Sequence, residues 1–161
     1  MYLGMLFALF VALPLASIAI ERTRGRSMAG LTELALKWFV FWAVGVRLFT
    51  AGASQVMRPD FTAASIFQIS DPVVIPFIQE LGFANIAMGL MAMISLGAAS
   101  WRRAAALLGF VFFGAAGVRH ALSAEAFNTL KLAAMASDLY IAAVLGVLLA
   151  LSLRGSRPPH P

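Results

Sequence analysis

Five long runs of apolar residues alternate with short polar stretches along this chain. Each run approaches or exceeds the ~20 residues that a helix needs to cross the hydrocarbon core of a bilayer. The pattern predicts an all-α fold, an integral membrane helical bundle of about five transmembrane helices, in which a four-helix core follows an N-terminal helix. The single domain covers residues 1–153, with spans at about 1–20, 31–57, 72–100, 104–122 and 137–153, before a tail at 154–161.

The polar stretches between the runs carry signals for helix ends. Asp71 followed by Pro72 is typical of a helix start, because an aspartate caps free backbone N–H groups and proline fits the first turn. The connection 58–71 contains several apolar side chains, which predicts a short helix lying at the membrane surface. Pro14 removes a backbone donor from the first run, so we expect a kink there.

Positive charge is distributed unevenly over the connections. Eight of the twelve lysine and arginine residues fall on one side of the predicted bundle, three on the other and one within a span. The richer side is expected to be cytoplasmic, which predicts a multi-pass protein of the bacterial inner membrane with its N-terminus outside and its C-terminus inside. The first run has its arginines after it, unlike a signal peptide, so we expect a retained helix. The eight residues are Arg22, Arg24, Arg26, Lys37, Arg102, Arg103, Arg154 and Arg157.

Composition supports the membrane assignment. The chain of 161 residues is 61% hydrophobic and only 12% charged, whereas soluble domains carry about 25% charged residues. The absence of cysteine excludes disulfides and thiolate metal sites. The net charge of +5 resides at helix ends, so it indicates membrane orientation and not nucleic-acid binding. We find no catalytic motif, and the sequence leans away from an enzyme.

Six polar residues within or beside the spans are the candidate site residues. A charge near the centre of a bilayer costs at least ~2.5–3.5 kcal/mol, so such groups pair with one another or face water. They form a candidate polar cluster in the outer half or the middle of the bundle, which predicts a polar pocket open to the outer side. The six are Arg47, Glu80, Asn85, Arg119, His120 and Asp138.

Two of these residues lie at matching depth. At 1.5 Å per residue, Arg47 is about 15 Å from the inner end of its helix and Glu80 about 12 Å from the outer end of the next. We therefore expect an ion pair or hydrogen bond between them, either a structural clamp or part of a buried site. Asn85 lies on another face, with Gly82 and Gly89, and is expected to form an interhelical hydrogen bond. Two polar faces predict that the third helix is central.

The other three leave alternatives open. His120 is compatible with structural hydrogen bonding, with a proton-handling or ligand-binding role, or with a metal, although the sequence offers no second membrane histidine and we assign no metal site. Arg119 is expected to anchor the helix at the interface. Asp138 either caps its helix or pairs with Arg119 or His120.

The run Glu80-Leu81-Gly82-Phe83-Ala84-Asn85-Ile86-Ala87-Met88-Gly89 resembles the E-x-G-F-A-N-x-A-x-G signature of an uncharacterised bacterial multi-span membrane family, a domain of unknown function. The resemblance covers residues 31–150 and implies that Glu80, Asn85 and His120 matter to the family. The chain departs from that pattern at Arg119, where glycine is usual, and after Ile66. A fainter similarity to DoxX-like small membrane proteins implies quinone-linked chemistry.

Three functions remain after this reading. The first is a small accessory or scaffold subunit of a larger membrane complex, which small size and Gly/Ala-rich helix faces favour. The second is a binder or redox partner of a small hydrophobic molecule such as a quinone, and the third is a proton or ion pathway. No cofactor is evident, with a quinone or a lipid left open. The expected partners are the lipid bilayer and other membrane-protein subunits or further copies of the chain.

Overall fold

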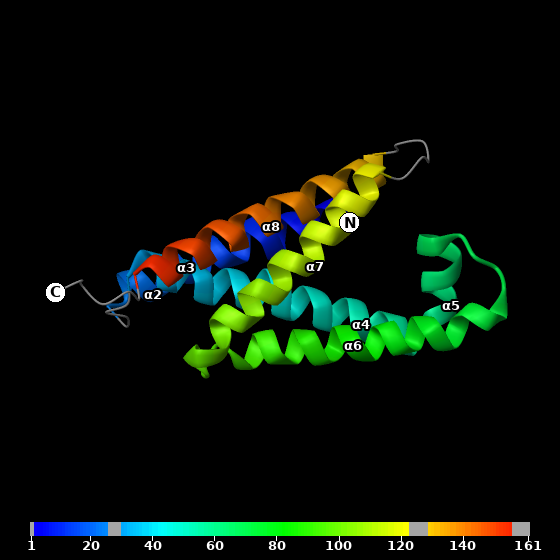
Figure 1. The fold of residues 1–161 in the computed structure, drawn as a ribbon, viewed down its shortest axis with the longest axis horizontal. Helices are drawn as coiled ribbons and strands as arrows, with labels where there is room; N and C mark the ends of the chain where they lie inside the picture. Colours follow the sequence, from blue (N-terminus) through cyan, green and yellow to red (C-terminus); the bar gives the residue numbers. More distant parts are fainter. Residues whose placement is uncertain (1, 26–29, 123–128, 156–161) are drawn as a thin grey trace.

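A computed structural model describes residues 2–25, 30–122 and 129–155 of the chain, and the described part is helical and contains no strand (Figure 1). Five helices are long and apolar enough to cross a membrane, which confirms the predicted all-α, membrane-spanning fold. Parts of the predicted loops and tail, at 26–29, 123–128 and 156–161, lie outside the described residues. The five spans are Leu3–Thr23, Leu31–Met57, Pro72–Ile94, Ala99–Leu122 and Leu132–Arg154.

The first span changes its helical form ahead of its proline. Helix α1 (Tyr2–Phe7) passes into the π-helical turn η1 (Ala8–Ala12), and α2 (Leu13–Thr23) follows with Pro14 in its first turn. Proline lacks the N–H that an α-helix would bond to the carbonyl four residues earlier, and its ring crowds that carbonyl. The wider π turn gives the backbone room at this point.

The second span is the central helix of the bundle. It consists of α3 (Leu31–Phe39), the π-helical η2 (Val40–Val46) and α4 (Arg47–Met57). In its most apolar window 44% of residues are buried, against 22–28% in the other four spans. It packs against helices of all four other spans. The prediction that the third helix is central is therefore wrong.

The connection to the third span is itself helical, as predicted. Helix α5 (Pro59–Thr62) and the π-helical η3 (Ala63–Phe67) form it, and the turn η4 (Pro72–Val74) leads into α6 (Ile75–Ile94). Asp71 caps η4, accepting a hydrogen bond of 2.9 Å from the backbone N–H of Val73. This contact confirms the predicted helix start.

The remaining boundaries differ from the prediction by several residues. Helix α6 ends at Ile94 and not near residue 100, and the turn η5 (Ala99–Trp101) precedes α7 (Arg102–Leu122). Helix α8 (Thr129–Arg154) begins eight residues before the predicted 137. After Thr129, residues 130–136 are leucine, lysine, alanine and methionine, which all favour a helix, so they extend the helix where a loop was expected.

Four glycines hold α6 against the second span. A Cβ atom added to Gly52 would lie 2.5 Å from the carbonyl oxygen of Gly82, and one on Gly89 would lie 2.5 Å from the backbone nitrogen of Phe49. Gly45 meets Met93 in the same way, with its Cβ position 2.7 Å from Cγ. Glycine thus permits backbone to pack directly on backbone, the way small residues bring membrane helices together.

Helices α7 and α8 form the second close pair. They pack against each other, and α7 runs obliquely from the end of α6 towards the start of α8 (Figure 1). Cβ positions at Gly109 and Gly117 would approach Val44, Leu145 and Leu139 to within 2.5–2.8 Å. Gly114, by contrast, has ordinary clearance, with its nearest neighbour at 3.8 Å.

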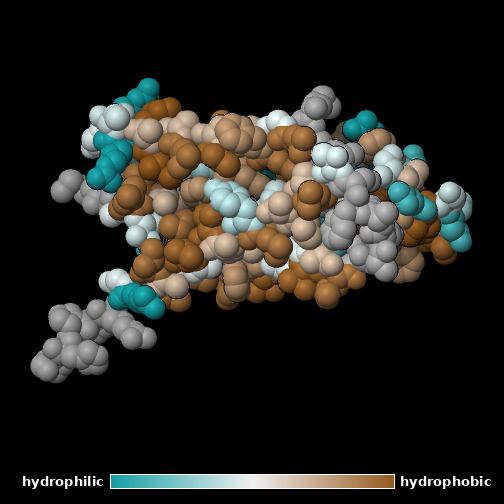
Figure 2. All heavy atoms as spheres, turned by 90° about the horizontal axis from the view of Figure 1, so that it is seen from above, coloured by the Kyte–Doolittle hydropathy of each residue, from teal (hydrophilic) through white to brown (hydrophobic). Residues whose placement is uncertain are grey.

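Apolar residues also cover the outside of the protein. In Figure 2 they extend along the molecule, and the most hydrophilic residues gather towards its two ends. Exposed side chains include Phe77, Phe83, Phe110 and Val147, at 67%, 57%, 42% and 60%. Such a surface is unfavourable in water and matches the hydrocarbon of a bilayer.

Substitution of Gly52 by alanine tests the α4–α6 contact. The new methyl group would collide with backbone atoms of α6, and overpacking of this kind costs about 1–3 kcal/mol. We expect the thermal unfolding temperature in detergent, followed by circular dichroism, to fall. Gly114→Ala is the matched control, because its methyl has room in another spanning helix. If both variants unfolded at the same temperature as the parent chain, the close α4–α6 contact at Gly52 would be contradicted.

Candidate functional site

Arg47 occupies the middle of the central helix. It follows the π-helical turn η2 directly, and the residue is half-buried. Its Nε atom is buried and has no hydrogen-bond partner among the described residues. A guanidinium at this depth normally forms an ion pair or faces water. Single π-helical turns often occur at functional sites, so the unsatisfied donor is a candidate binding group.

Arg47 acts electrostatically on Asp138, an acid on α8. Asp138 is buried, and the positive charge of Arg47 acts on its carboxylate, although no salt bridge within 4.0 Å joins the two described residues. Oδ2 of Asp138 lies 4.0 Å from Nε2 of His120 on α7, a pair that attracts when the imidazole is protonated. Asp138 is ten residues into its helix, so the capping role is wrong and the pairing with His120 is confirmed.

The predicted pair of Arg47 and Glu80 does not form. No salt bridge connects the two side chains, both of which are described. The buried positions of α6, from Ile78 to Ala92, face α4, while Glu80 lies on the opposite side and is exposed. Rotation about the α6 axis directs the Glu80 carboxylate away from the central helix, so an equal depth would not bring the two side chains together.

Asn85 meets the expectation of an interhelical hydrogen bond. Its Nδ2 donates to Oε1 of Gln55 on α4 at 2.8 Å, and Asn85 is 3% exposed. It shares its buried face with Gly82 and Gly89, as predicted. Its Oδ1 atom is buried without a partner among the described residues. The contact is part of the α4–α6 packing and is separate from Arg47.

Arg119 lies apart from the other candidates. It is exposed in the last turn of α7 and borders a shallow hollow of about 520 Å³ with Ala115, Val118 and Leu122. The structure therefore divides the six predicted residues into separate places. Asp138 lies beside His120 and feels the charge of Arg47, whereas Glu80, Asn85 and Arg119 do not join them.

A polar network at the opposite end of the bundle was missed by the sequence reasoning. Glu33 on α3 lies 3.9 Å from a terminal nitrogen of Arg102 and 3.7 Å from one of Arg103, and it accepts a short hydrogen bond from the hydroxyl of Ser152. Arg103 Nε donates to the same hydroxyl at 2.9 Å. The network connects the second, fourth and fifth spans.

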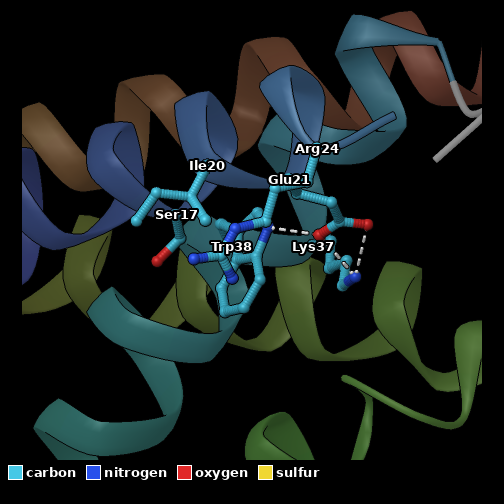
Figure 3. A pocket seen from close by; sticks show the side chains of 6 residues that line it. All are labelled: Ser17, Ile20, Glu21, Arg24, Lys37 and Trp38. Carbon is cyan, nitrogen blue, oxygen red and sulfur yellow. Dashed lines mark hydrogen bonds and ion pairs between the residues drawn. The ribbon is translucent and has the colours of Figure 1, made fainter. Parts of the chain in front are cut away.

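Glu21 was missed as well. It accepts two hydrogen bonds from Nζ of Lys37, at 2.8 and 2.7 Å, and one from Nε1 of Trp38 at 2.8 Å (Figure 3). These acids were identifiable in principle, because each is an isolated carboxylate at the end of a span that is otherwise flanked by arginine and lysine. An unpaired charge at that level of the membrane is energetically costly, so opposite charges there are expected to form ion pairs.

Five helices that are long and apolar enough to cross a membrane, packed into one all-α bundle, define a multi-span helical membrane protein. The chain belongs to a family of unknown function, DUF6790, which matches residues 2–158. This result agrees with the resemblance to an uncharacterised family. No curated protein and no solved structure matches the chain.

A double-mutant cycle measures the Asn85–Gln55 bond. Side-chain hydrogen bonds between membrane helices contribute about 0.6 kcal/mol on average and at most about 1.7 kcal/mol. We expect Asn85→Ala and Gln55→Ala to be coupled by an energy in this range, in equilibrium unfolding in mixed micelles. Thr50→Ala with Asn85→Ala is the control pair, since Thr50 bonds only to carbonyls of its own helix. Additive effects for Asn85 and Gln55 would show that the bond is not formed.

Proposed function

We propose that this protein is a small accessory or scaffold subunit of a larger membrane assembly and that it binds a partner helix through the outward face of α6. One observation supports the proposal above all others. Glu80 is exposed within a spanning helix, on a face otherwise formed by apolar side chains, and no described residue pairs with it. We place the assembly in the bacterial inner membrane, with the basic end cytoplasmic.

The energetic argument concerns the carboxylate. A charged group on a lipid-facing surface costs at least ~2.5–3.5 kcal/mol near the bilayer centre, and polar residues in spans almost always face protein or water. Phe77 and Phe83, at 67% and 57% exposed, flank Glu80 on the same face. This face therefore needs a protein neighbour that hydrogen-bonds to the carboxylate and packs against the aromatic and aliphatic side chains.

The chemistry of Glu80 also restricts the partner. A symmetric contact between two α6 helices would bring two carboxylates together, and like charges at close range repel in a medium of low polarity. A partner surface with an arginine, lysine or other donor at this depth satisfies the carboxylate instead. A different surface, on another protein or on another part of a second copy, fits this requirement.

Substitution of Glu80 by leucine separates a partner contact from a lipid contact. We expect the parent chain, purified in mild detergent, to carry a stoichiometric partner on native electrophoresis. In Glu80→Leu that association should weaken about tenfold or more, because hydrogen bonds to charged groups contribute about 1.5–3 kcal/mol. The melting temperature of the isolated chain should stay level or rise, since the carboxylate has no partner inside the bundle.

Val147→Leu serves as the control for the Glu80 experiment. Val147 is 60% exposed on α8, so the change alters another outer face without affecting charge. We expect it to leave the association intact. A stable monomer for both the parent chain and Glu80→Leu would refute the subunit proposal.

A second candidate function is suggested by Arg47. Its buried Nε has no described partner, and Asp138 and His120 stand nearby. A small hydrophobic molecule with an acceptor oxygen, such as a quinone, would satisfy the guanidinium without introducing a charge. The unsatisfied donor is the specific observation behind this candidate.

Direct binding measurements test the Arg47 candidate. We expect a short-chain benzoquinone, titrated into the purified protein, to bind the parent chain and to bind Arg47→Leu about tenfold more weakly, the effect of losing one charge-assisted hydrogen bond. Arg58→Leu is the control, because Arg58 lies exposed at the end of the same helix. Equal affinity in the parent chain and Arg47→Leu would remove the basis for a ligand at this residue.

A further inference from the structure

A pocket opens between the first and second spans at the basic end of the bundle. Its volume is about 420 Å³, and α2 and α3 supply its walls (Figure 3). None of the six candidate residues lines it. The lining residues are Ser17, Ile20, Glu21, Arg24, Lys37 and Trp38.

The charges around the pocket do not cancel. Glu21 is bound by Lys37, whose ammonium also lies 5.0 Å from the centre of the Trp38 ring. This pair neutralises one acid with one base. Arg24 is exposed, and no described residue forms a salt bridge with it. The pocket therefore keeps one positive charge in excess, on a side chain that presents a fork of donors suited to phosphate oxygens.

The pocket also has an apolar side. Ile20, which is 49% exposed, lies one turn before Thr23, where the first span ends. Trp38 forms the opposite wall, and indole rings favour the boundary between hydrocarbon and headgroups. The pocket thus joins an apolar surface within the span to a cation just beyond it. The phosphate and the upper acyl chain of a membrane lipid meet at this level.

We propose that this pocket binds the phosphate headgroup of an anionic phospholipid, with Arg24 as the main contact and Lys37 and Trp38 as its supporting wall. The phosphate would accept hydrogen bonds from the Arg24 guanidinium, and an acyl chain would run along Ile20. The apolar wall favours a lipid over free phosphate, because a free anion gains nothing from Ile20. The excess positive charge favours an anionic lipid over a zwitterionic one.

Lipid retention by the intact protein tests the proposal. The full chain is delipidated in detergent and titrated with phosphatidylglycerol or phosphatidylcholine of equal chain length, and bound lipid is counted by native mass spectrometry. We expect preferential retention of phosphatidylglycerol. Arg24→Gln should weaken it about fivefold, the effect expected of one basic residue beside an anionic lipid. Ile20→Trp, which fills the pocket without changing charge, should weaken it to a similar extent.

Arg154→Gln is the matched control. Arg154 is an exposed arginine in the last turn of α8, at the same end of the bundle, and its removal changes net charge equally. We expect unchanged retention. Equal losses in Arg24→Gln and Arg154→Gln would reduce the effect to net charge and overturn the site. Displacement of the lipid by excess inorganic phosphate would assign the pocket to a free anion, and equal retention of both lipids would likewise overturn the proposal.

Discussion

The direct contact of α4 and η2 with α6 is the constraint on which the rest of the structure depends. Glycine at Gly45, Gly52, Gly82 and Gly89 lets two backbones approach closely enough that a single methyl group would collide. In a bilayer, where apolar side chains gain little by leaving lipid, such close packing is a principal source of helix association. Because this face of α6 is committed to the central helix, its other face, with Glu80, must point outwards.

Charged side chains are paired to different extents at the basic end of the bundle and in its middle. At the basic end, Glu21 and Glu33 form ion pairs and hydrogen bonds with lysine, arginine, tryptophan and serine side chains, in networks that involve four of the five spans. Nε of Arg102 and Nε of Arg47 are both buried without a hydrogen-bond partner among the described residues. Arg102 has Glu33 within ion-pair distance, whereas no described acid forms a salt bridge with Arg47, and this difference supports the proposal of a ligand at Arg47.

Three features of the described residues support the proposals of a neighbouring molecule. They are the carboxylate on the outward face of α6, the guanidinium within the bundle and the cationic pocket at the end of the first span. Each suits a different class of partner: a helix with a donor, a hydrophobic molecule with an acceptor oxygen, and an anionic lipid. The role that we propose, a small membrane subunit positioned by lipid and by a larger complex, unites the first and the third.

The amino-acid sequence by itself determined the class of fold, the five spans and the start of the third span at Asp71, because apolar run length and capping chemistry are local properties. It also identified the glycine-lined face of Asn85. Only the tertiary structure decided that the second span is central, that Glu80 turns away from Arg47, and that Asp138 meets His120 in mid-helix. Depth in a membrane follows from counting residues, whereas the direction of a side chain depends on how each helix is rotated against its neighbours. That rotation is set by long-range packing of small residues, which no single stretch of the chain contains.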